Sequence, residues 1–477
     1  FREYERAATT EVDAALSPLL AGYLRRLAER CRAQEVPVPA IMQSNGGLID
    51  AAAAASHAAW TVLSGPAGGA AGAAFLARAL GAARALCLDM GGTSCDVCVV
   101  DDGAVREESS GEIGGRPLTL PMLAVHTVGA GGGSIGWRDP GGALRVGPHS
   151  AGAQPGPASY GRGGTEPTVT DANVVLGRLS SDSPLAGDVN LDPSAAERAV
   201  AALGGPLGLG TEECAEGMLR VAVAEMVRAL RVVTVQRGVD PREYALLAFG
   251  GAGPLHAAAI AEELGMSTVL CPRTSGVLAA LGLVVSQRRR DLQRSVFLSG
   301  ESLTSEAIEA TVDQLAESAR QALGEADAEI HVVFELRYRG QSFELPVAGG
   351  PRLTPGELRS AFEAEHEQRY GYRDSAAVLE LVTIRVSATI PGSEVELTGG
   401  TKNGQAPPSS TRRMVFGGRS VEAIVVSGVP DPGTRLTGPA AIELPESTIL
   451  IPPGWTGEVD QTGTTWLRAT APAERGT

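Results

Sequence analysis

The sequence has almost no lysine. Lys402 is the only lysine among the 477 residues, and it lies in the loop-like segment TKNGQAPPSS. A P-loop needs a lysine after its glycines, and a Schiff-base enzyme needs one in its active site. Both chemistries are therefore excluded, and any nucleotide bound here is held without a P-loop.

Long apolar runs and excess positive charge are also missing. No stretch of ~18 or more apolar residues free of charge, Gly and Pro is present, so we expect no membrane span. The chain opens on the charged, amphipathic FREYERAATTEVDAAL rather than on a signal peptide. The formal net charge of −15 argues against nucleic acid or an anionic membrane as the main partner. We expect a cytoplasmic protein of two or three domains.

The six cysteines are scattered, and most lie in apolar runs, as reduced core thiols do. Cys95 and Cys98 form a C-x-x-C, but no second pair exists for a zinc ribbon and the pair sits in a strand-like segment. We interpret them as core residues in a reducing compartment, with a redox or metal role as the alternative.

A strand, a tight turn and a returning strand are predicted for residues 86–100, LCLDMGGTSCDVCVV. The two glycines carry no Cβ, so the turn can bring backbone N–H groups close to an anion, and two hydroxyl residues add donors. The flanking aspartates suit Mg²⁺, directly or through water, or an attacking water. The alternative is a plain hairpin. The candidate residues are Asp89, Gly91, Gly92, Thr93, Ser94 and Asp96.

Two further glycine-rich loops follow apolar strands. The first, in residues 121–135 (PMLAVHTVGAGGGSI), contains His126 and is a second candidate anion loop, with a flexible surface turn as the alternative. The second follows the predicted strand 244–249 and opens a helix that Gly265 ends, which places free N–H groups and a positive helix end at one spot. It is not a dinucleotide fingerprint, because His256 occupies the third glycine position. The loop residues are Gly129, Gly131, Gly132, Gly133 and Ser134 in the first and Gly250, Gly251 and Gly253 in the second.

The rest of the chain predicts the domain organisation. Residues 147–171 are rich in Gly and Pro and too long for a simple connection, so they are either functional or disordered; Tyr160, Arg162, Thr170 and Asp171 are the residues of interest there. Helices are expected at 1–30, from Ser64 to Gly81, and at 212–237, 304–323 and 355–369. We predict domains at 1–290 and 291–390, a linker at 391–412 and a small β domain at 413–477.

Taken together, the motifs resemble those of the hydantoinase A/oxoprolinase family. The match runs from residue 1 to about residue 290 and continues more weakly beyond it. It rests on FREYERAATT, MQSNGGL, LSGPAGGAAGAA, DMGGTSCDV, VHTVGAGGGSIGW, GPHSAGAQPGPASYGRGGTEPTVTDANVVLGRL, RGVDPREYALLAFGGAGPLHA and SGVLAALGL.

The resemblance implies an α/β fold of the actin-like (ribonuclease H-like) ATPase type, with two related halves around a nucleotide cleft. It also implies ATP- and Mg²⁺-dependent opening of a cyclic amide such as 5-oxoproline or a hydantoin. Phosphorylating the oxygen of an unstrained lactam turns it into an electrophile with a good leaving group. Relatives include the acetone and acetophenone carboxylases, in which a carbonyl or enolate oxygen is phosphorylated.

Carried over residue by residue, the resemblance assigns the three glycine loops to the nucleotide. Gly91, Gly92, Thr93 and Ser94 would contact phosphate, and Asp89, Asp96 and His126 would be catalytic. The remaining nucleotide contacts would be Gly131, Gly132, Gly133, Ser134, Gly250, Gly251 and Gly253. A second divalent ion, Zn²⁺ or Mn²⁺, would have His126, Asp171 and His256 as ligands, with hydrogen-bonded core residues as the alternative.

Several positions depart from the family pattern. Members usually begin with a further N-terminal half that carries a first DxGGTxTD motif, whereas Phe1 corresponds to mid-family. We therefore expect a shortened chain, a proteolytic product or one subunit of a split enzyme. The family has Asp at Ala124, Thr at Cys95 and Cys at Ser159, so a ligand or base and a phosphate-loop hydroxyl are replaced here.

Three functions compete on this basis. The first is the ATP-using subunit or fragment of a cyclic amide hydrolase, which works with a hydantoinase B-type subunit in a hetero-oligomer, and with a separate N-terminal half-domain chain if the enzyme is split. The second is a subunit of a ketone carboxylase, which would consume ATP only with bicarbonate. The third is a non-catalytic assembly or regulatory protein, which the departures at Ala124 and Cys95 would explain.

Overall fold

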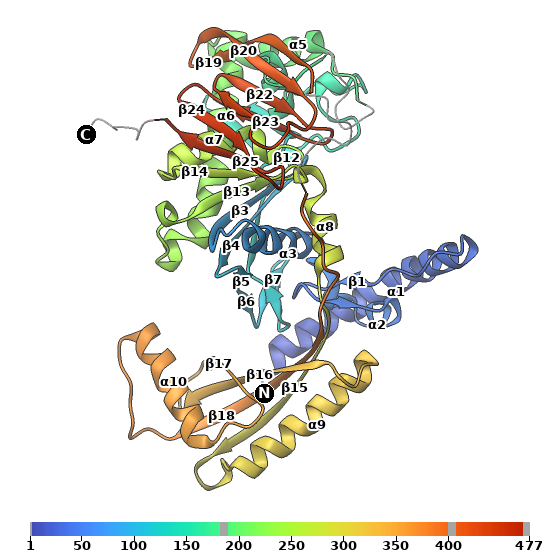
Figure 1. The fold of residues 1–477 in the computed structure, drawn as a ribbon, viewed down its shortest axis with the longest axis vertical. Helices are drawn as coiled ribbons and strands as arrows, with labels where there is room; N and C mark the ends of the chain where they lie inside the picture. Colours follow the sequence, from blue (N-terminus) through green and yellow to red (C-terminus); the bar gives the residue numbers. More distant parts are fainter. Residues whose placement is uncertain (1, 182–188, 399–406, 471–477) are drawn as a thin grey trace. The chain divides into compact units, whose positions relative to one another are not determined.

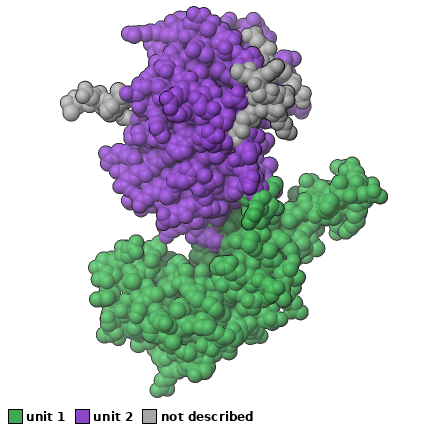
Figure 2. All heavy atoms as spheres, in the orientation of Figure 1, with its two compact units in different colours: residues 1–64, 109–122, 284–394 green, residues 65–108, 123–283, 395–477 purple. Residues whose placement is uncertain are grey.

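The computed structural model describes residues 2–181, 189–398 and 407–470. The chain folds into two compact units that interleave along the sequence. Unit 1 comprises residues 1–64, 109–122 and 284–394, and unit 2 comprises 65–108, 123–283 and 395–477 (Figure 2). This differs from the consecutive domains predicted from the sequence, because the chain enters unit 1 three times. Residues 399–406 of the predicted linker lie outside the described residues.

Unit 2 is built on a mixed nine-stranded sheet in the order β10-β4-β3-β13-β14-β25-β24-β21, with β5 beside β4 (Figure 1). The central strands β3, β13 and β14 are parallel, and their neighbours on both sides are antiparallel. The strands are β3 (Arg84–Met90), β4 (Cys95–Asp101), β5 (Ala104–Val105), β10 (Val125–Val128), β13 (Ala245–Phe249), β14 (Thr268–Cys271), β21 (Arg435–Thr437), β24 (Trp455–Val459) and β25 (Thr465–Ala469).

Helices bury both faces of this sheet. Because side chains alternate along a strand, Leu88 and Val97 pack with α6 and α7 on one face, whereas Cys87 and Cys98 pack with α3 on the other. The helices and the short β11–β12 ribbon of the unit are α3 (Ser64–Ala79), α4 (Val169–Val175), α5 (Pro193–Leu207), α6 (Thr211–Val233), α7 (Gly253–Leu264), α8 (Leu278–Val285), β11 (Ser134–Arg138) and β12 (Leu144–Ser150).

The C-terminal strands do not form the separate β domain that the sequence predicted. Strands β21, β24 and β25 extend the main sheet, since β25 pairs with β14 and places Leu467 opposite Val269. The other four strands form a small sheet, which packs into the same core as α7. They are β19 (Ser409–Phe416), β20 (Arg419–Ser427), β22 (Ala440–Glu443) and β23 (Thr448–Ile451).

Helices α3 and α8 pack at unusually close range because both carry glycines at the contact (Figure 1). A Cβ on Gly282 of α8 would lie 1.9 Å from the carbonyl oxygen of Gly68, and a Cβ on Gly72 of α3 would lie 2.5 Å from that of Leu278. These glycines allow the two helix backbones to come into direct contact.

We expect Gly282→Ala to destabilise the protein. The new methyl group meets backbone atoms that cannot rotate away, so the helices must separate, which costs about 1–3 kcal/mol as overpacking does. Urea unfolding measures the loss. Gly22→Ala is the matched control, because the nearest atom to its Cβ is the flexible Arg26 guanidinium, 3.5 Å away, and the control should be neutral or slightly stabilising. Equal stability of Gly282→Ala and wild type would show that the close helix contact is wrong.

Unit 1 contains a six-stranded sheet in the order β1-β2-β15-β18-β16-β17. Helices α9 and α10 cover one face, where Phe334, Ile384 and Phe362 form the core. The elements are α1 (Glu3–Ala33), β1 (Ile41–Met42), β2 (Leu48–Ile49), α2 (Ala51–Ser56), β15 (Arg288–Ser299), α9 (Ser305–Leu323), β16 (Glu329–Tyr338), β17 (Leu345–Gly349), α10 (Pro355–Tyr370) and β18 (Leu379–Ile390). Among the described residues, no helix combines the length and apolar character that crossing a membrane requires.

Candidate functional site

The predicted strand–turn–strand is confirmed as the β3–β4 hairpin. Asp89 and Asp96 lie directly opposite each other near the turn end of the ladder, and the N–H of Gly91 donates to the carbonyl oxygen of Ser94 at 3.1 Å. Thr93 is exposed at the tip of the turn. The hairpin therefore brings two carboxylates next to a turn of small and hydroxyl residues.

The other two glycine loops meet this turn. Gly132 and Gly133 donate through their N–H groups to the carbonyl oxygens of Gly91 and Gly92, at 3.0 and 2.6 Å. A Cβ on Gly131 would lie 2.6 Å from the Gly92 carbonyl carbon, so only glycine permits this approach. From the third loop, Ala252 donates to the carbonyl oxygen of Met90 at 3.0 Å. Loops from three distant parts of the sequence thus converge at the end of β3.

A cavity of about 190 Å³ lies where the loops converge. Its walls include backbone that no side chain covers, because a Cβ on Gly92 would meet nothing within 4 Å and a Cβ on Gly251 would meet only a carbonyl oxygen at 3.5 Å. Within the described part of the chain, the N–H groups of Gly92, Thr93 and Gly251 donate to no partner. The lining residues are Gly91, Gly92, Gly132, Tyr160, Val169, Thr170, Asn173, Leu179, Gly251, Ala252, Leu255, His256 and Glu446.

This arrangement suits an anion such as phosphate. Unpaired N–H groups point from glycine-rich turns, and the twelve-residue helix α7 begins at Gly253 beside them with its positive end. Gly250 has φ of +79°, and a Cβ there would lie 2.4 Å from the carbonyl oxygen of Met90. The third loop therefore requires glycine both for its conformation and for its contact with β3.

The two aspartates are partly withdrawn from water. Burial, followed by the charge of Asp96, raises the pKa of Asp89 to about 6. Burial also raises the pKa of Asp96, and a hydrogen bond from the Thr127 hydroxyl partly offsets this rise. Among the described residues no donor reaches the carboxylate of Asp89, and glycines at positions 69 and 250 leave it room, since Cβ atoms there would lie 2.9 and 2.5 Å from its oxygens. Two adjacent carboxylates without a full set of donors fit the oxygen ligands of Mg²⁺.

Ser134 has a structural role that differs from the predicted ligand contact. Its side chain is fully buried, and its Oγ accepts from the N–H of Gly131 at 2.8 Å and donates to the Gly129 carbonyl at 3.5 Å. The hydroxyl shapes the second loop from inside and does not line the cavity.

The three predicted ligands of a second metal are not brought together. His126 pairs with Val97 across β10 and β4, whereas its neighbour Thr127 reaches Asp96, so His126 lies on the opposite face of the sheet from the aspartates. Among the described residues, no three His, Cys, Asp or Glu side chains gather as a metal site. Because His126 lies on the face opposite the aspartates, its position does not support a catalytic role together with them.

Asp171 is instead a helix cap. It is fully buried and accepts from the N–H groups of Ala158, Ser159 and Thr168 at 3.2, 2.8 and 2.8 Å, and from the Thr168 hydroxyl at 2.8 Å. Three of these bonds end on Oδ2 and one on Oδ1, so both oxygens of this fully buried carboxylate are engaged in shaping the loop and the helix start. The core alternative for this residue is the one that the structure supports.

His256 lines the cavity as a neutral side chain. It is 2% exposed, and burial, followed by the charge of Arg178, lowers its pKa to about 3. Its Nε2 has no hydrogen-bond partner among the described residues. The imidazole is therefore an uncharged, buried group beside the cavity, with its Nε2 unpaired among the described residues.

Sequence reasoning missed two polar residues of the cavity wall, Asn173 and Glu446. Asn173 is buried on α4, where its Nδ2 donates to the Val169 carbonyl at 2.9 Å and its Oδ1 has no partner in the described structure. Its position two residues after Asp171 was the available signal. Glu446 comes from the turn between β22 and β23, and only the long-range fold brings it to the cavity.

The structure also shows where the two cysteines of the C-x-x-C lie. All six cysteines are free, and Cys95 and Cys98 point to opposite faces of β4, where each is buried in a different apolar core. The interpretation as core thiols is supported.

Comparison with known proteins gives a consistent picture. The family described as hydantoinase/oxoprolinase matches residues 6–292. The caprolactamase alpha subunit of Pseudomonas jessenii is 35% identical over 485 residues, covering 97% of this chain and 69% of the relative.

Two solved structures resemble the fold. The match to the ATP-dependent caprolactamase of Pseudomonas jessenii has a TM-score of 0.82 and 33% sequence identity. It covers 99% of this chain and 71% of the caprolactamase chain. The match to a nucleotide-free acetone carboxylase structure also has a TM-score of 0.82, with 26% sequence identity. It covers 98% of this chain and 70% of the carboxylase chain. The chain therefore spans about seven tenths of the length of these proteins.

Proposed function

The chain belongs to the hydantoinase/oxoprolinase family, and from this premise we propose that it is the ATP-using subunit of an enzyme that opens a cyclic amide. The observation that carries the proposal is the cavity where three glycine loops meet and leave N–H groups unpaired, close to the hairpin turn that two partly buried aspartates flank. Caprolactamase, a cyclic amide hydrolase by name, is 35% identical in its alpha subunit, and its structure has the same fold.

The described residues fit a nucleotide and its metal ion. The N–H groups of Gly92, Thr93 and Gly251 would hold phosphate oxygens, with the positive end of α7 adding to the field. The carboxylates of Asp89 and Asp96 would hold Mg²⁺. When bound, ATP supplies the phosphoryl group that makes an amide oxygen a leaving group. This chain's part is to fix the phosphates, balance their charge and exclude water around them.

The arrangement also supports the finer fold proposal. A hairpin with an aspartate on each strand beside its turn and a strand–glycine-loop–helix unit on one sheet resemble one half of an actin-like, ribonuclease H-like ATPase cleft. We propose unit 2 as that half and a hydantoinase B-type subunit as a partner, since relatives named as alpha, beta and gamma subunits belong to multi-subunit enzymes.

A ketone carboxylase subunit is the second candidate function. It is favoured by the acetone carboxylase structure, which matches with the same TM-score as caprolactamase. We rank it second because this chain is 26% identical to the acetone carboxylase structure and 33% identical to the caprolactamase structure.

Calorimetry of Mg·ATP binding tests the proposal first. Saturable binding is expected either to this chain alone or after a family N-terminal half is added in trans, and no binding in both cases would favour a non-catalytic protein. ADP release by the assembled subunits then separates the two activities. We expect release with ε-caprolactam, 5-oxoproline or hydantoin and a ring-opened product, whereas release that requires acetone and bicarbonate would assign the carboxylase.

A further inference from the structure

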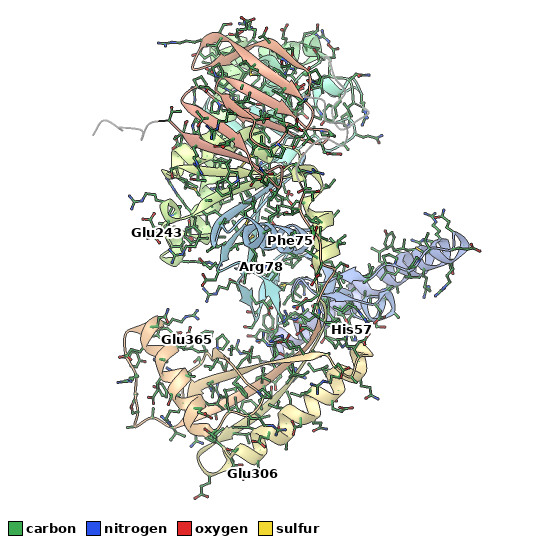
Figure 3. All side chains as sticks on the ribbon, in the orientation of Figure 1. His57, Phe75, Arg78, Glu243, Glu306 and Glu365 are labelled. Carbon is green, nitrogen blue, oxygen red and sulfur yellow. The ribbon has the colours of Figure 1, made fainter. Side chains whose placement is uncertain are left out.

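Unit 2 contains a second and larger cavity, of about 570 Å³, which the nucleotide proposal leaves unexplained. It lies between helices α6 and α7 and the small sheet of β19, β20, β22 and β23 (Figure 1), and Figure 3 draws the side chains of these elements. Of the residues that line it, only Leu255 and His256 also line the nucleotide cavity. The cavity is therefore a separate space with walls of its own.

The floor of this cavity is aliphatic. Leu219, Val223 and Val227 follow one another at four-residue spacing on α6 and form one stripe of the helix, and Leu255 and Leu450 complete the floor. Each of the five side chains is at most 8% exposed. Apolar surface this deeply buried is reached by a thin hydrocarbon chain inside the cavity, whereas the side of a partner helix or sheet would need exposed side chains to pack on.

Arg178 lines the cavity as a partly buried cation without an ion pair among the described residues. Its Nη2 donates to the Val415 carbonyl at 3.2 Å, and its guanidinium carbon lies 5.0 Å from the centroid of the Phe416 ring, so the side chain is held in place. Its Nε is enclosed, whereas Nη1 has no partner and is not enclosed, so Nη1 is the nitrogen that a ligand can reach. A buried cation is costly unless it is paired, and an anion at Nη1 would pair it.

The other charged groups of the lining leave this cation unmatched. They are Arg220, Arg231, Glu216, Glu262 and Glu263. Glu216 accepts from the N–H of Gly418 at 3.0 Å, and Glu262 accepts from Nε1 of Trp455 at 2.6 Å. None of the three arginines forms an ion pair within the described part of the chain. The lining is formally neutral, but two of its carboxylates already accept hydrogen bonds while its cations are unpaired, so it suits an added anion better than an added cation.

The size of the cavity limits the length of the chain that it holds. At about 30 Å³ for a water-sized group, 570 Å³ corresponds to roughly nineteen non-hydrogen atoms. A carboxylate of about ten to fourteen carbons has about twelve to sixteen such atoms and therefore fits with room to spare.

We propose that this cavity binds a straight-chain carboxylate of about this length. The carboxylate accepts from Nη1 of Arg178, and the hydrocarbon chain packs on Leu219, Val223 and Leu450. A cation of the same length fits worse because Arg178 repels it, and a short carboxylate fits worse because it leaves the aliphatic floor in contact with water. The site requires no nucleotide, so it stands or falls independently of the proposed function.

Calorimetry of decanoate binding to the full chain, without nucleotide, tests the ligand class. We expect saturable binding of one decanoate, with hexanoate and decyltrimethylammonium each at least about tenfold weaker. No saturation with decanoate would overturn the proposal. Decyltrimethylammonium binding as tightly as decanoate would also overturn it, because the arginine would then contribute nothing, and so would equal affinity for hexanoate, because the floor would then be unused.

Arg178→Gln tests the position of the carboxylate. It removes the charge and should weaken decanoate at least about tenfold, whereas the loss for uncharged 1-decanol should stay below about twofold. Equal losses for decanoate and 1-decanol would show that Arg178 acts through the fold rather than on the carboxylate, and unchanged decanoate affinity would place the carboxylate elsewhere. Either result would overturn the proposal.

A double variant tests the position of the hydrocarbon chain. Ala224 on α6 and Ala259 on α7 are exposed and line the cavity, so phenylalanine at both positions fills its mouth and should weaken decanoate at least about tenfold. Phenylalanine at Ala201 and Ala202, both exposed on α5 of the same unit, is the matched control and should leave the affinity as in wild type. If Arg178→Gln proves unstable in thermal unfolding, the double variant decides alone, and unchanged decanoate affinity in it overturns the proposal.

Discussion

Asp89→Asn is expected to lower amide-dependent ADP release by at least about 100-fold in the assembled enzyme while making the nucleotide-free chain more stable. The rate falls because the neutral amide cannot hold Mg²⁺ as a carboxylate does, and loss of such charge stabilisation typically costs 10²–10³-fold. Stability rises because the folded protein buries this carboxylate without a hydrogen-bond donor among the described residues. Steady-state ADP release and urea unfolding measure the two effects.

The gain in stability should depend on pH in a defined direction. Folding raises the pKa of Asp89 from 3.8 to about 6, so the folded state binds the proton more tightly than the unfolded state. Wild-type stability contributed by this group is therefore present at low pH and is lost as the pH rises from about 4 to about 6. At pH 7 the Asn variant avoids this penalty of up to about 3 kcal/mol, at 1.36 kcal/mol per pKa unit, and the gain vanishes near pH 4.

Asp192→Asn is the control for both measurements. Asp192 caps α5 from the surface of the same unit by accepting from the N–H of Ala195, and asparagine caps helices equally well. It should change neither the rate nor the pH dependence of stability. An Asp89→Asn enzyme with wild-type turnover would remove this carboxylate from the proposed site, and a less stable variant would mean that the burial penalty is misjudged.

The hairpin and the glycine loops were predictable from the sequence because their signals are local. Short apolar runs mark β3, β4 and β13, and glycines mark the turns that follow β3 and β13. Convergence of the loops could be expected only through the family resemblance, because hydrogen bonds such as Gly133 to Gly92 join distant segments.

Two incorrect site assignments had local signals that the sequence analysis did not use. Thr168 and Asp171 stand three apart at a helix start, the spacing of a capping box, which the structure contains. Strand alternation puts His126 on the face opposite Thr127, away from the aspartates. His126 and Asp171 were both predicted to bind a metal ion because they lie near a glycine loop. The local backbone pattern already accounts for where each residue lies.

The division into domains could not be predicted from local patterns. Strand β25 reads as part of an ordinary β segment, and nothing near it indicates that Leu467 pairs with Val269 at the edge of the main sheet. The same long-range folding brings Glu446 to the cavity. Such partners depend on which sheet edge is free, a property of the whole fold.

Gly250→Ala is expected to weaken Mg·ATP binding by at least tenfold and to destabilise the chain. A Cβ at this position would lie 2.4 Å from the Met90 carbonyl oxygen and 2.5 Å from Asp89 Oδ1, and the backbone has φ of +79°, where L-residues are strained. Strain of this kind costs about 1–3 kcal/mol, and relieving the clash displaces both the third loop and the carboxylate. Calorimetry and urea unfolding report the two losses.

Gly251→Ala provides the comparison within the same loop. Its Cβ would find only the Glu446 carbonyl oxygen, at an ordinary 3.5 Å, and its φ lies outside the left-handed region. The methyl group therefore leaves the loop in place, and stability should stay within about 0.5 kcal/mol of wild type. Because the Gly251 N–H still faces the cavity, nucleotide affinity should fall much less than in Gly250→Ala. If both variants lost the same nucleotide affinity and stability, the close approach of Gly250 to β3 and Asp89 would not be the cause of the losses.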